Sequence, residues 1–372
     1  MNKPKIVTDL QLLMCIATTV IGVGILAFPR ITVKYTATGA PMSTFFGFLL
    51  VLLACVTLAY LGEKYPKKSL FEYSDLLLSK WVGGMITLAV SIYFIELAAL
   101  AAREFGEVVI TSVLPQTPLE VTVFIMLILA VISSRCDVAV FTRIITFFMP
   151  LVYFPALVIV FLTLKSASLT NIFPIVNVFY ETTWTNMLRS SLTVAAVLQN
   201  FLIIGLLTPF MYQPKKAMKS VSLGIGLAGV LYLILIFATL SVFGFDEIKN
   251  LLWPTLELAK TAAFPTLFFE RLDPIFISVW VTAVFTAILS SYYIALQGLT
   301  HLLRFTNHKV FTFILFPFVF ILAMQSANEF ILYDVIERIG LMGLPLTIGF
   351  PFLLFVIHHM KNLIQSKRGT KL

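Results

Sequence analysis

Four side chains that could bind a ligand lie in the apolar stretch 82–112: Tyr93, Glu96, Arg103 and Glu107. Their spacings of 3, 7 and 4 residues place them on one face of an α-helix. At about 1.5 Å per residue, Glu96 falls near the middle of a bilayer. A carboxylate is costly there unless it is protonated, paired or hydrated. Glu96 therefore either binds a ligand's ammonium group or a proton, or it is a structural partner of Arg103 or of a polar helix nearby.

Two glycines interrupt the first apolar run at a depth where a helix should be unbroken. Residues 18–30 read Thr-Thr-Val-Ile-Gly-Val-Gly-Ile-Leu-Ala-Phe-Pro-Arg, with Gly22 and Gly24 near the predicted midplane. Glycine in a helix interior costs about 0.5–1 kcal/mol relative to alanine, and lipid cannot satisfy the backbone groups that a break frees. Secondary transporters use such broken helices to bind anionic groups at half-helix N-termini and cations at freed carbonyls. The alternative is a close contact between helices through small residues.

A second break is predicted in the stretch 187–211. Its middle carries Gln199 and Asn200, and the helix breakers Gly205 and Pro209 follow. A Gln-Asn pair at mid-membrane costs several kilocalories per mole if it is unsatisfied. The pair therefore indicates either a ligand site or polar contacts between helices.

The stretch 274–303 carries a polar face that extends over most of a membrane. Its residues follow one another at spacings of 4, 4, 3 and 4: Thr282, Thr286, Ser290, Tyr293 and Gln297. This face is a candidate for a hydrated pathway. The alternative is contact between helices through Ser and Thr.

The composition is that of an integral membrane protein. Of 372 residues, 59% are hydrophobic and only 12% are charged, with a mean hydropathy of +0.99. A soluble domain is about a quarter charged. The apolar runs are long enough for helical spans, and the N-terminal run has no cleavage site, so we interpret it as a retained first span. Neither a metal-ligand spacing nor a catalytic constellation is evident in the sequence, so we expect no metal, no cofactor and no enzymatic activity. The net charge of +8 needs no nucleic-acid partner to explain it.

We predict ten membrane spans, at 9–31, 42–62, 82–112, 118–135, 138–165, 187–211, 219–244, 274–303, 309–325 and 339–360. With the N-terminus inside, the inner segments hold 17 of the 26 Lys and Arg residues. Positive residues favour the cytoplasmic side, so both termini are predicted to be cytoplasmic. Five spans in each half make the second half an inverted copy of the first. The expected fold is thus an all-α integral membrane protein, a single transmembrane domain over 1–372 with repeats at 1–170 and 180–372 and broken helices 1 and 6.

The chain resembles a known family in three features. They are the run Ile21-Gly22-Val23-Gly24-Ile25-Leu26-Ala27-Phe28-Pro29-Arg30, the segment Ala102-Arg103-Glu104-Phe105-Gly106-Glu107 with Leu114-Pro115-Gln116-Thr117-Pro118, and the ten-span layout. Together they resemble the B subunits of spore germinant receptors, the spore germination protein family within the amino acid–polyamine–organocation superfamily. The resemblance covers essentially the whole chain.

The resemblance implies a LeuT-like five-plus-five inverted repeat and a place in the inner membrane of bacterial endospores. It also implies an A subunit and a lipoprotein C subunit as partners, and a small germinant, usually an amino acid, as the ligand. The implied ligand site maps onto Thr19, Gly22, Gly24 and Ile25, with Tyr93, Gln199 and Asn200 facing them. The ligand's carboxylate would meet N–H groups freed at the first break, its ammonium group would turn toward carbonyls or Glu96, and its side chain would lie near Ile25 and Phe201.

Because a fold does not determine a single function, two functions of different classes are compatible with this fold. A receptor subunit needs only different ligand affinities in two conformations that partner proteins distinguish. An amino acid permease, which would be proton-coupled, needs alternating access and release of its substrate. The sequence leaves both open, and it does not identify the germinant.

Overall fold

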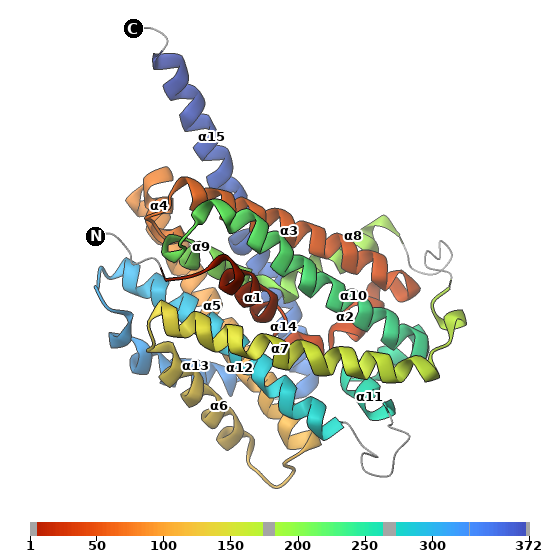
Figure 1. Ribbon diagram of the computed structural model, residues 1–372. Coiled ribbons are helices and arrows are strands. Elements are labelled where there is room, and N and C mark those ends of the chain that lie inside the picture. The colour runs from red at the N-terminus through yellow and green to blue at the C-terminus, as the bar shows by residue number, and fades with distance from the viewer. Residues whose placement is uncertain (1–5, 174–182, 263–272, 327, 370–372) are drawn as a thin grey trace.

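A computed structural model describes residues 6–173, 183–262, 273–326 and 328–369 of the chain (Figure 1). The first half holds α1 (Asp9–Thr19), η1 (Val23–Ile25), α2 (Phe28–Thr36), η2 (Ala37–Gly39), α3 (Ala40–Lys64), α4 (Leu70–Leu77), α5 (Lys80–Ser112), α6 (Leu119–Ser134), α7 (Val138–Thr163), η3 (Leu164–Ser166) and η4 (Leu169–Asn171).

The second half begins with a broken segment made of α8 (Trp184–Val197), η5 (Gln199–Ile203), α9 (Ile204–Leu207) and η6 (Thr208–Phe210). It continues with η7 (Pro214–Lys216), α10 (Ala217–Asn250), α11 (Pro254–Thr261), α12 (Asp273–Leu302), η8 (His308–Val310), α13 (Thr312–Ala323), α14 (Glu329–Leu344), the π-helix η9 (Pro345–Gly349) and α15 (Phe350–Gly369).

Both predicted breaks are present. Span one is divided into α1 and α2 by the turn that contains Gly22 and Gly24, and span six bends by 51° between Val197 and Gln199. Within the described residues, six helical stretches are long and apolar enough to cross a membrane, and the bent pair makes a seventh. The remaining predicted spans correspond to the shorter apolar helices α1, α6 and α13. The prediction of an all-α membrane fold with broken first and sixth helices is confirmed.

The helices pack in pairs that join the two halves of the chain. α5 lies along α12, while α10 lies along α1 and α3, and α3 also contacts α8. The chain before α1 meets the end of span six, where the Ile6 and Val7 amides donate to the Phe210 carbonyl at 2.8 and 3.0 Å. Both termini emerge at the same end of the bundle, from which the last turns of α15 project (Figure 1). The division into repeats at 1–170 and 180–372 remains a prediction.

Three element boundaries differ from those predicted. α2 continues to Thr36, and α14 begins at Glu329, about three turns before the predicted tenth span. The spacing of Trp253, Pro254, Glu257, Lys260 and Pro265 in the segment 245–273 predicts short amphipathic helices on the outer surface. Instead, α10 extends to Asn250, and Thr255 and Leu258 of α11 are buried. α11 packs against α2, α7, α10 and α12, and it is therefore part of the bundle. Pro265 of that segment lies outside the described residues.

Single-cysteine labelling tests the predicted orientation. Lys67, Lys216 and Asn250 are exposed, and Lys216 Nζ lies 3.7 Å from Asp9 Oδ2 in the first turn of α1. We expect Lys67→Cys and Lys216→Cys to be protected from an impermeant reagent added outside, and Asn250→Cys to react. Labelling of the first two from outside would show that the orientation is reversed.

Candidate functional site

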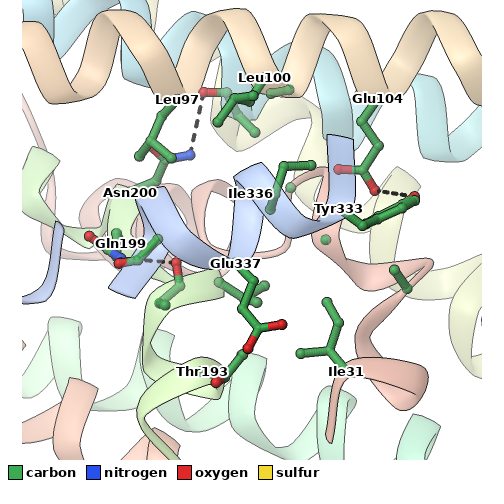
Figure 2. Close-up of a pocket in the computed structure, with 18 of the residues that line it drawn as sticks. Ile31, Leu97, Leu100, Glu104, Thr193, Gln199, Asn200, Tyr333, Ile336 and Glu337 are labelled. Atoms are coloured by element: carbon green, nitrogen blue, oxygen red, sulfur yellow. Dashed lines mark hydrogen bonds between the residues drawn. The ribbon is translucent and has the colours of Figure 1, made fainter. Parts of the chain in front are cut away.

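A cavity of about 260 Å³ lies between the two breaks. Five of the predicted spans line it, as Figure 2 shows for α5, α8 and α14. Span one contributes Thr19, Gly22, Gly24, Ala27, Arg30, Ile31 and Lys34, and span six contributes Thr193, Ala196, Val197, Gln199 and Asn200. The other lining residues are Leu97, Leu100, Ala101 and Glu104 of α5, Ala287 and Ser291 of α12, and Tyr333, Asp334, Ile336, Glu337 and Gly340 of α14.

The two glycines of span one permit a close approach as well as a cavity. A Cβ on Gly24 would lie 2.6 Å from Val197 Cγ1, and one on Gly22 would lie 3.0 Å from Ala287 Cβ. Because real side chains do not come within 2.6 Å of each other, a larger residue at position 24 must displace the Val197 side chain. The glycines therefore make a close contact between helices, and they also form part of the cavity wall. Their predicted role in ligand binding remains a prediction.

The carbonyls around the first break accept hydrogen bonds from hydroxyl groups on other helices. Tyr153 of α7 donates to Ala17 at 3.1 Å, and Tyr232 of α10 donates to Val20 at 3.3 Å and to Ile21 at 3.2 Å. On the other side of the break, Thr255 of α11 donates to the Ile25 carbonyl at 2.8 Å. Sequence reasoning assigned freed carbonyls to cations or to the ligand's ammonium group, whereas these four are satisfied by the protein itself.

Gln199 and Asn200 mark the second break and tie it to neighbouring spans. The Gln199 amide donates to the Gly340 carbonyl at 2.5 Å, and its oxygen accepts from the Thr347 hydroxyl at 2.9 Å. The Asn200 oxygen accepts from Ser291 of α12 at 2.8 Å. Both residues line the cavity while their amides bind neighbouring helices. Span six is thereby joined to span ten through Gln199 and to span eight through Asn200.

Glu104 is the buried carboxylate of the site, and sequence reasoning did not assign it a role. It is 4% exposed, it lines the cavity, and its Oε1 accepts from the Tyr333 hydroxyl at 3.0 Å (Figure 2). Trp253 donates its indole N–H to the same hydroxyl at 2.6 Å. Leu97, Leu100, Ala101 and Glu104 share one helix face at spacings of 3, 1 and 3, a pattern that could have identified this residue.

Glu337, which lines the cavity, joins three spans at that point. Its carboxylate accepts from Lys34 Nζ at 2.9 Å and from the Tyr35 hydroxyl, and Arg189 lies 3.9 Å away. Arg189 also stacks over the Tyr35 ring, 4.5 Å from its centroid. These contacts fix α14 to α2 and to α8. Polar and charged groups of three spans therefore meet at Glu337, on one side of the cavity.

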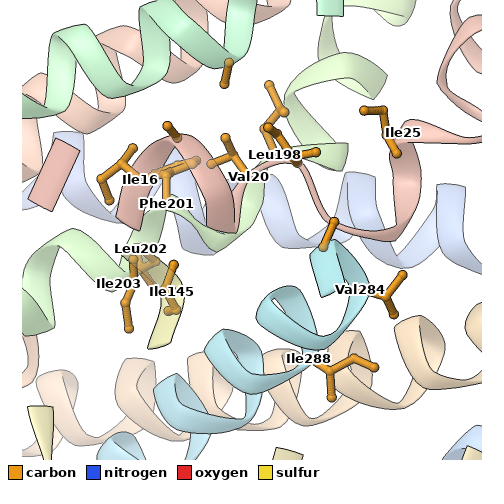
Figure 3. Close-up of a cluster of buried hydrophobic side chains, with 14 of the residues drawn as sticks. Ile16, Val20, Ile25, Ile145, Leu198, Phe201, Leu202, Ile203, Val284 and Ile288 are labelled. Carbon is orange, nitrogen blue, oxygen red and sulfur yellow. The ribbon is translucent and has the colours of Figure 1, made fainter. Parts of the chain in front are cut away.

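Several predicted site residues are not brought to the cavity wall. Ile25 and Phe201 belong to the buried hydrophobic cluster in Figure 3, which packs the two breaks against each other. Tyr93 packs against Gly343 of α14, and Glu96 is half-buried with no hydrogen bond to the described residues. The binding roles predicted for these four residues remain untested.

The predicted stripe on α5 does not act as a unit. Arg103 pairs with Glu107 at 2.7 Å, so Glu96 is not its partner. Glu96 and Arg103 lie outside the cavity wall, which is formed by the face that carries Leu97, Leu100 and Glu104.

The polar face of α12 is satisfied mainly within its own helix. Thr282, Thr286 and Ser290 donate to the carbonyls of Val279, Ala283 and Thr286 at 2.6 to 2.8 Å. Tyr293 stacks on Phe141 with ring centroids 4.5 Å apart. Thr286, Ser290 and Tyr293 are buried. The role predicted for this face, as a hydrated pathway or as a contact between helices, remains a prediction.

The cavity can hold a small molecule that carries charges of both signs. Arg30 and Lys34 contribute positive charge, whereas Glu104, Asp334 and Glu337 contribute negative charge. Leu97, Leu100, Ile31 and Ile336 supply apolar walls. Among the described residues, no group of three His, Cys, Asp or Glu side chains is placed to hold a metal ion.

The family model and the known proteins that are similar to this chain carry the same description. A family model described as "Spore germination protein" matches residues 6–331. Spore germination protein YndE of Bacillus subtilis is 28% identical over 371 residues, which cover 98% of each chain. Spore germination protein B2 of the same organism is 28% identical over 81% of this chain and 80% of its own, and GerLB of Bacillus cereus is 23% identical over 93% and 92%.

Solved transporters share the fold. A Na⁺-coupled sialic acid symporter in a substrate-bound outward-open state superposes with a TM-score of 0.70 at 12% identity, over 94% of this chain and 79% of its own. MhsT in complex with L-phenylalanine gives a TM-score of 0.61 at 12% identity, over 95% and 89%. The chain therefore has the LeuT-like fold that the sequence predicted.

The hydroxyl contacts at the first break lead to a stability prediction. Tyr232→Phe keeps the ring contacts with Phe28 and Phe48 but removes the donor to Val20 and Ile21. Leaving buried carbonyls unsatisfied costs about 1–3 kcal/mol, so thermal unfolding of the purified protein in detergent should move to lower temperature. Tyr212→Phe, at a residue 60% exposed, is the matched control and should leave the unfolding temperature unchanged. Equal unfolding temperatures for both variants would contradict the assigned role of Tyr232.

Proposed function

Because this chain belongs to the spore germination protein family, we propose that it is the germinant-sensing membrane subunit of a spore germination receptor. The germinant, a small molecule of the amino-acid type, would bind in the cavity between the broken helices. The observation that carries this proposal is a cavity of about 260 Å³ that has charged groups of both signs and two breaks in its wall. Thr19, Gly22, Gly24, Gln199 and Asn200, which sequence reasoning selected, line this cavity.

A ligand in this cavity would bias the relative positions of five spans. The wall combines residues of spans one, three, six, eight and ten, so a bound molecule contacts all of them at once. Gln199 and Glu337 already join span ten to spans six and one. A ligand shifts a conformational equilibrium only through a difference in affinity between the two states. A binding site shared by five spans can supply such a difference and signal it to partner proteins.

The proposal includes partners and a location. By analogy with relatives named as spore germination proteins B2, GerLB and GerQB, the chain would assemble with A and C subunits. It would lie in the inner membrane of the endospore with both termini in the cytoplasm. Co-purification of A and C subunits with a tagged copy of this chain, from membranes of dormant spores, tests the assembly.

An amino acid permease is the second candidate. The likeness to the sialic acid symporter and to MhsT favours it, because the first is a Na⁺-coupled symporter with bound substrate and the second binds L-phenylalanine, both in the same fold. Uptake of radiolabelled amino acid into proteoliposomes would support transport. Germination of spores with and without the gene, on a panel of alanine, proline, leucine and glucose, would support sensing if one response is lost.

The glycines of span one provide a sharper test of sensing. Gly24→Val and Gly22→Val place branched side chains against Val197 and Ala287 at the cavity wall. At normal protein level, each should raise the germinant concentration needed for half-maximal germination by about tenfold, or 1.4 kcal/mol. Gly226→Val is the matched control, because nothing lies within 4 Å of the added Cβ.

Response to a germinant that acts through another receptor should stay unchanged in all three variants. If Gly22→Val and Gly24→Val accumulate normally and respond at the wild-type concentration, the glycines serve only as a helix contact, and the site is misplaced.

A further inference from the structure

Two opposite charges face the cavity without pairing with each other. Arg30 and Glu104 both line it, but neither forms an ion pair with the other. We propose that Glu104 binds the ammonium group and Arg30 the carboxylate of the ligand, so that the site selects free α-amino acids by both charges at once. This inference rests on the proposed function, and it assigns the two groups of the ligand to residues other than those expected from the sequence.

The hydrogen-bond geometry fixes Glu104 as an acceptor. An indole N–H can only donate, so Trp253 occupies a lone pair of the Tyr333 oxygen at 2.6 Å. The Tyr333 proton is then directed at Glu104 Oε1, 3.0 Å away. Oε2 makes no hydrogen bond to any residue that the structure describes. The carboxylate is thus held at one oxygen, and its other oxygen is left for a donor in the cavity.

Two other cationic side chains, one next to Glu104 in the chain and one in the cavity wall, are already paired with other carboxylates. Arg103, next to Glu104 in the chain, pairs with Glu107 at 2.7 Å. Lys34 pairs with Glu337 at 2.9 Å. A carboxylate that is 4% exposed and has no cationic partner is costly, because the interior solvates charge poorly. A ligand's ammonium group would neutralise it with a charge-assisted hydrogen bond.

Arg30 is suited to the other end of the ligand. It follows Pro29 in the first turn of α2, it is partly buried, and it forms no ion pair or hydrogen bond with the described part of the chain. A guanidinium group offers paired donors that match a carboxylate. Ile31 beside it, with Leu97 and Leu100 on the facing helix, provides apolar surface for a small side chain. A molecule with only one of the two charges would leave Arg30 or Glu104 unpaired.

These two assignments are tested by measuring how tightly each variant binds each of several ligands. Binding to purified protein is measured as the shift in unfolding temperature over a concentration series. The probes are L-alanine, propionate, which lacks the amino group, and ethylamine, which lacks the carboxylate. Glycine, L-serine, L-valine, L-leucine and L-proline are also tested, to find the amino acid that the wild-type protein binds most tightly. If that amino acid is not alanine, its analogue without the amino group and its analogue without the carboxylate replace propionate and ethylamine as probes.

We expect wild type to bind the amino acid at least tenfold more tightly than either analogue. Glu104→Gln keeps an oxygen that can accept from Tyr333, so it should fold, but its preference for the amino acid over the des-amino acid should fall at least tenfold. Arg30→Gln should instead lose its preference over the amine. Glu107→Gln and Arg338→Gln, which lie outside the cavity wall, are the matched controls and should retain both preferences.

The outcomes separate this inference from the proposed function. If wild type binds an amino acid and both cavity variants retain both preferences, the assignments of Glu104 and Arg30 are wrong, while the binding function stands. If both preferences fall equally in each variant, the residues act through structure alone, which also contradicts the assignments. If no amino acid shifts the unfolding temperature of wild type, the proposed function fails, and the inference fails with it.

Discussion

The capping of the first break by hydroxyl groups is the interaction on which the rest of this structure depends. A helix opened inside a membrane protein leaves carbonyls that lipid cannot satisfy, and each buried one left alone costs about 1–3 kcal/mol. Tyr153, Tyr232 and Thr255 supply the missing donors from three different helices. The break therefore exists only when α7, α10 and α11 are in place. This explains why α11 is packed into the bundle instead of lying on its surface.

The cavity follows from this arrangement. The carbonyls at the break in span one accept hydrogen bonds from α7, α10 and α11. Gly22 and Gly24 approach spans eight and six and line the cavity. α14 then covers the remaining side, held by Glu337 in its middle and, about one turn further on, by Gly340, which accepts from Gln199. The groups that could meet a ligand's charges lie on α2 and α5. Both helices also hold α14, α2 through the contact of Lys34 with Glu337 and α5 through the contact of Glu104 with Tyr333. Ligand contacts and closing contacts therefore share these two helices, and span six adds a closing contact through Gln199.

The sequence predicted the spans and the breaks but not which helix faces line the site. Spans can be predicted from the length of the apolar runs and the thickness of the bilayer. Breaks can be predicted from Gly22, Gly24 and the pair at 199–200 without knowing which helices pack against them. Glu96 and Glu104 cannot be ranked in this way, because both lie on one long apolar helix. Packing against α12 and α6 decides which face of α5 is turned to the cavity. Similarly, the predicted span ten begins at residue 339, after the charged residues 334, 337 and 338. In the structure, Asp334 and Glu337 line the cavity.

The π-helix at Pro345–Gly349 sets the rotational phase between the two parts of span ten. A π-helical turn holds one residue more than an α-helical turn, and one residue corresponds to about 100° around a helix. The extra residue therefore rotates α15 relative to α14, compared with a continuous α-helix. This rotation sets the direction of exposed residues of α15, such as Val356 and Met360, relative to the residues of α14 that face the cavity. Loss of a single residue here would restore a regular helix and turn the whole of α15 by about a quarter of a revolution. A change in the length of this segment would therefore change which face of α15 continues the cavity-lining face of α14.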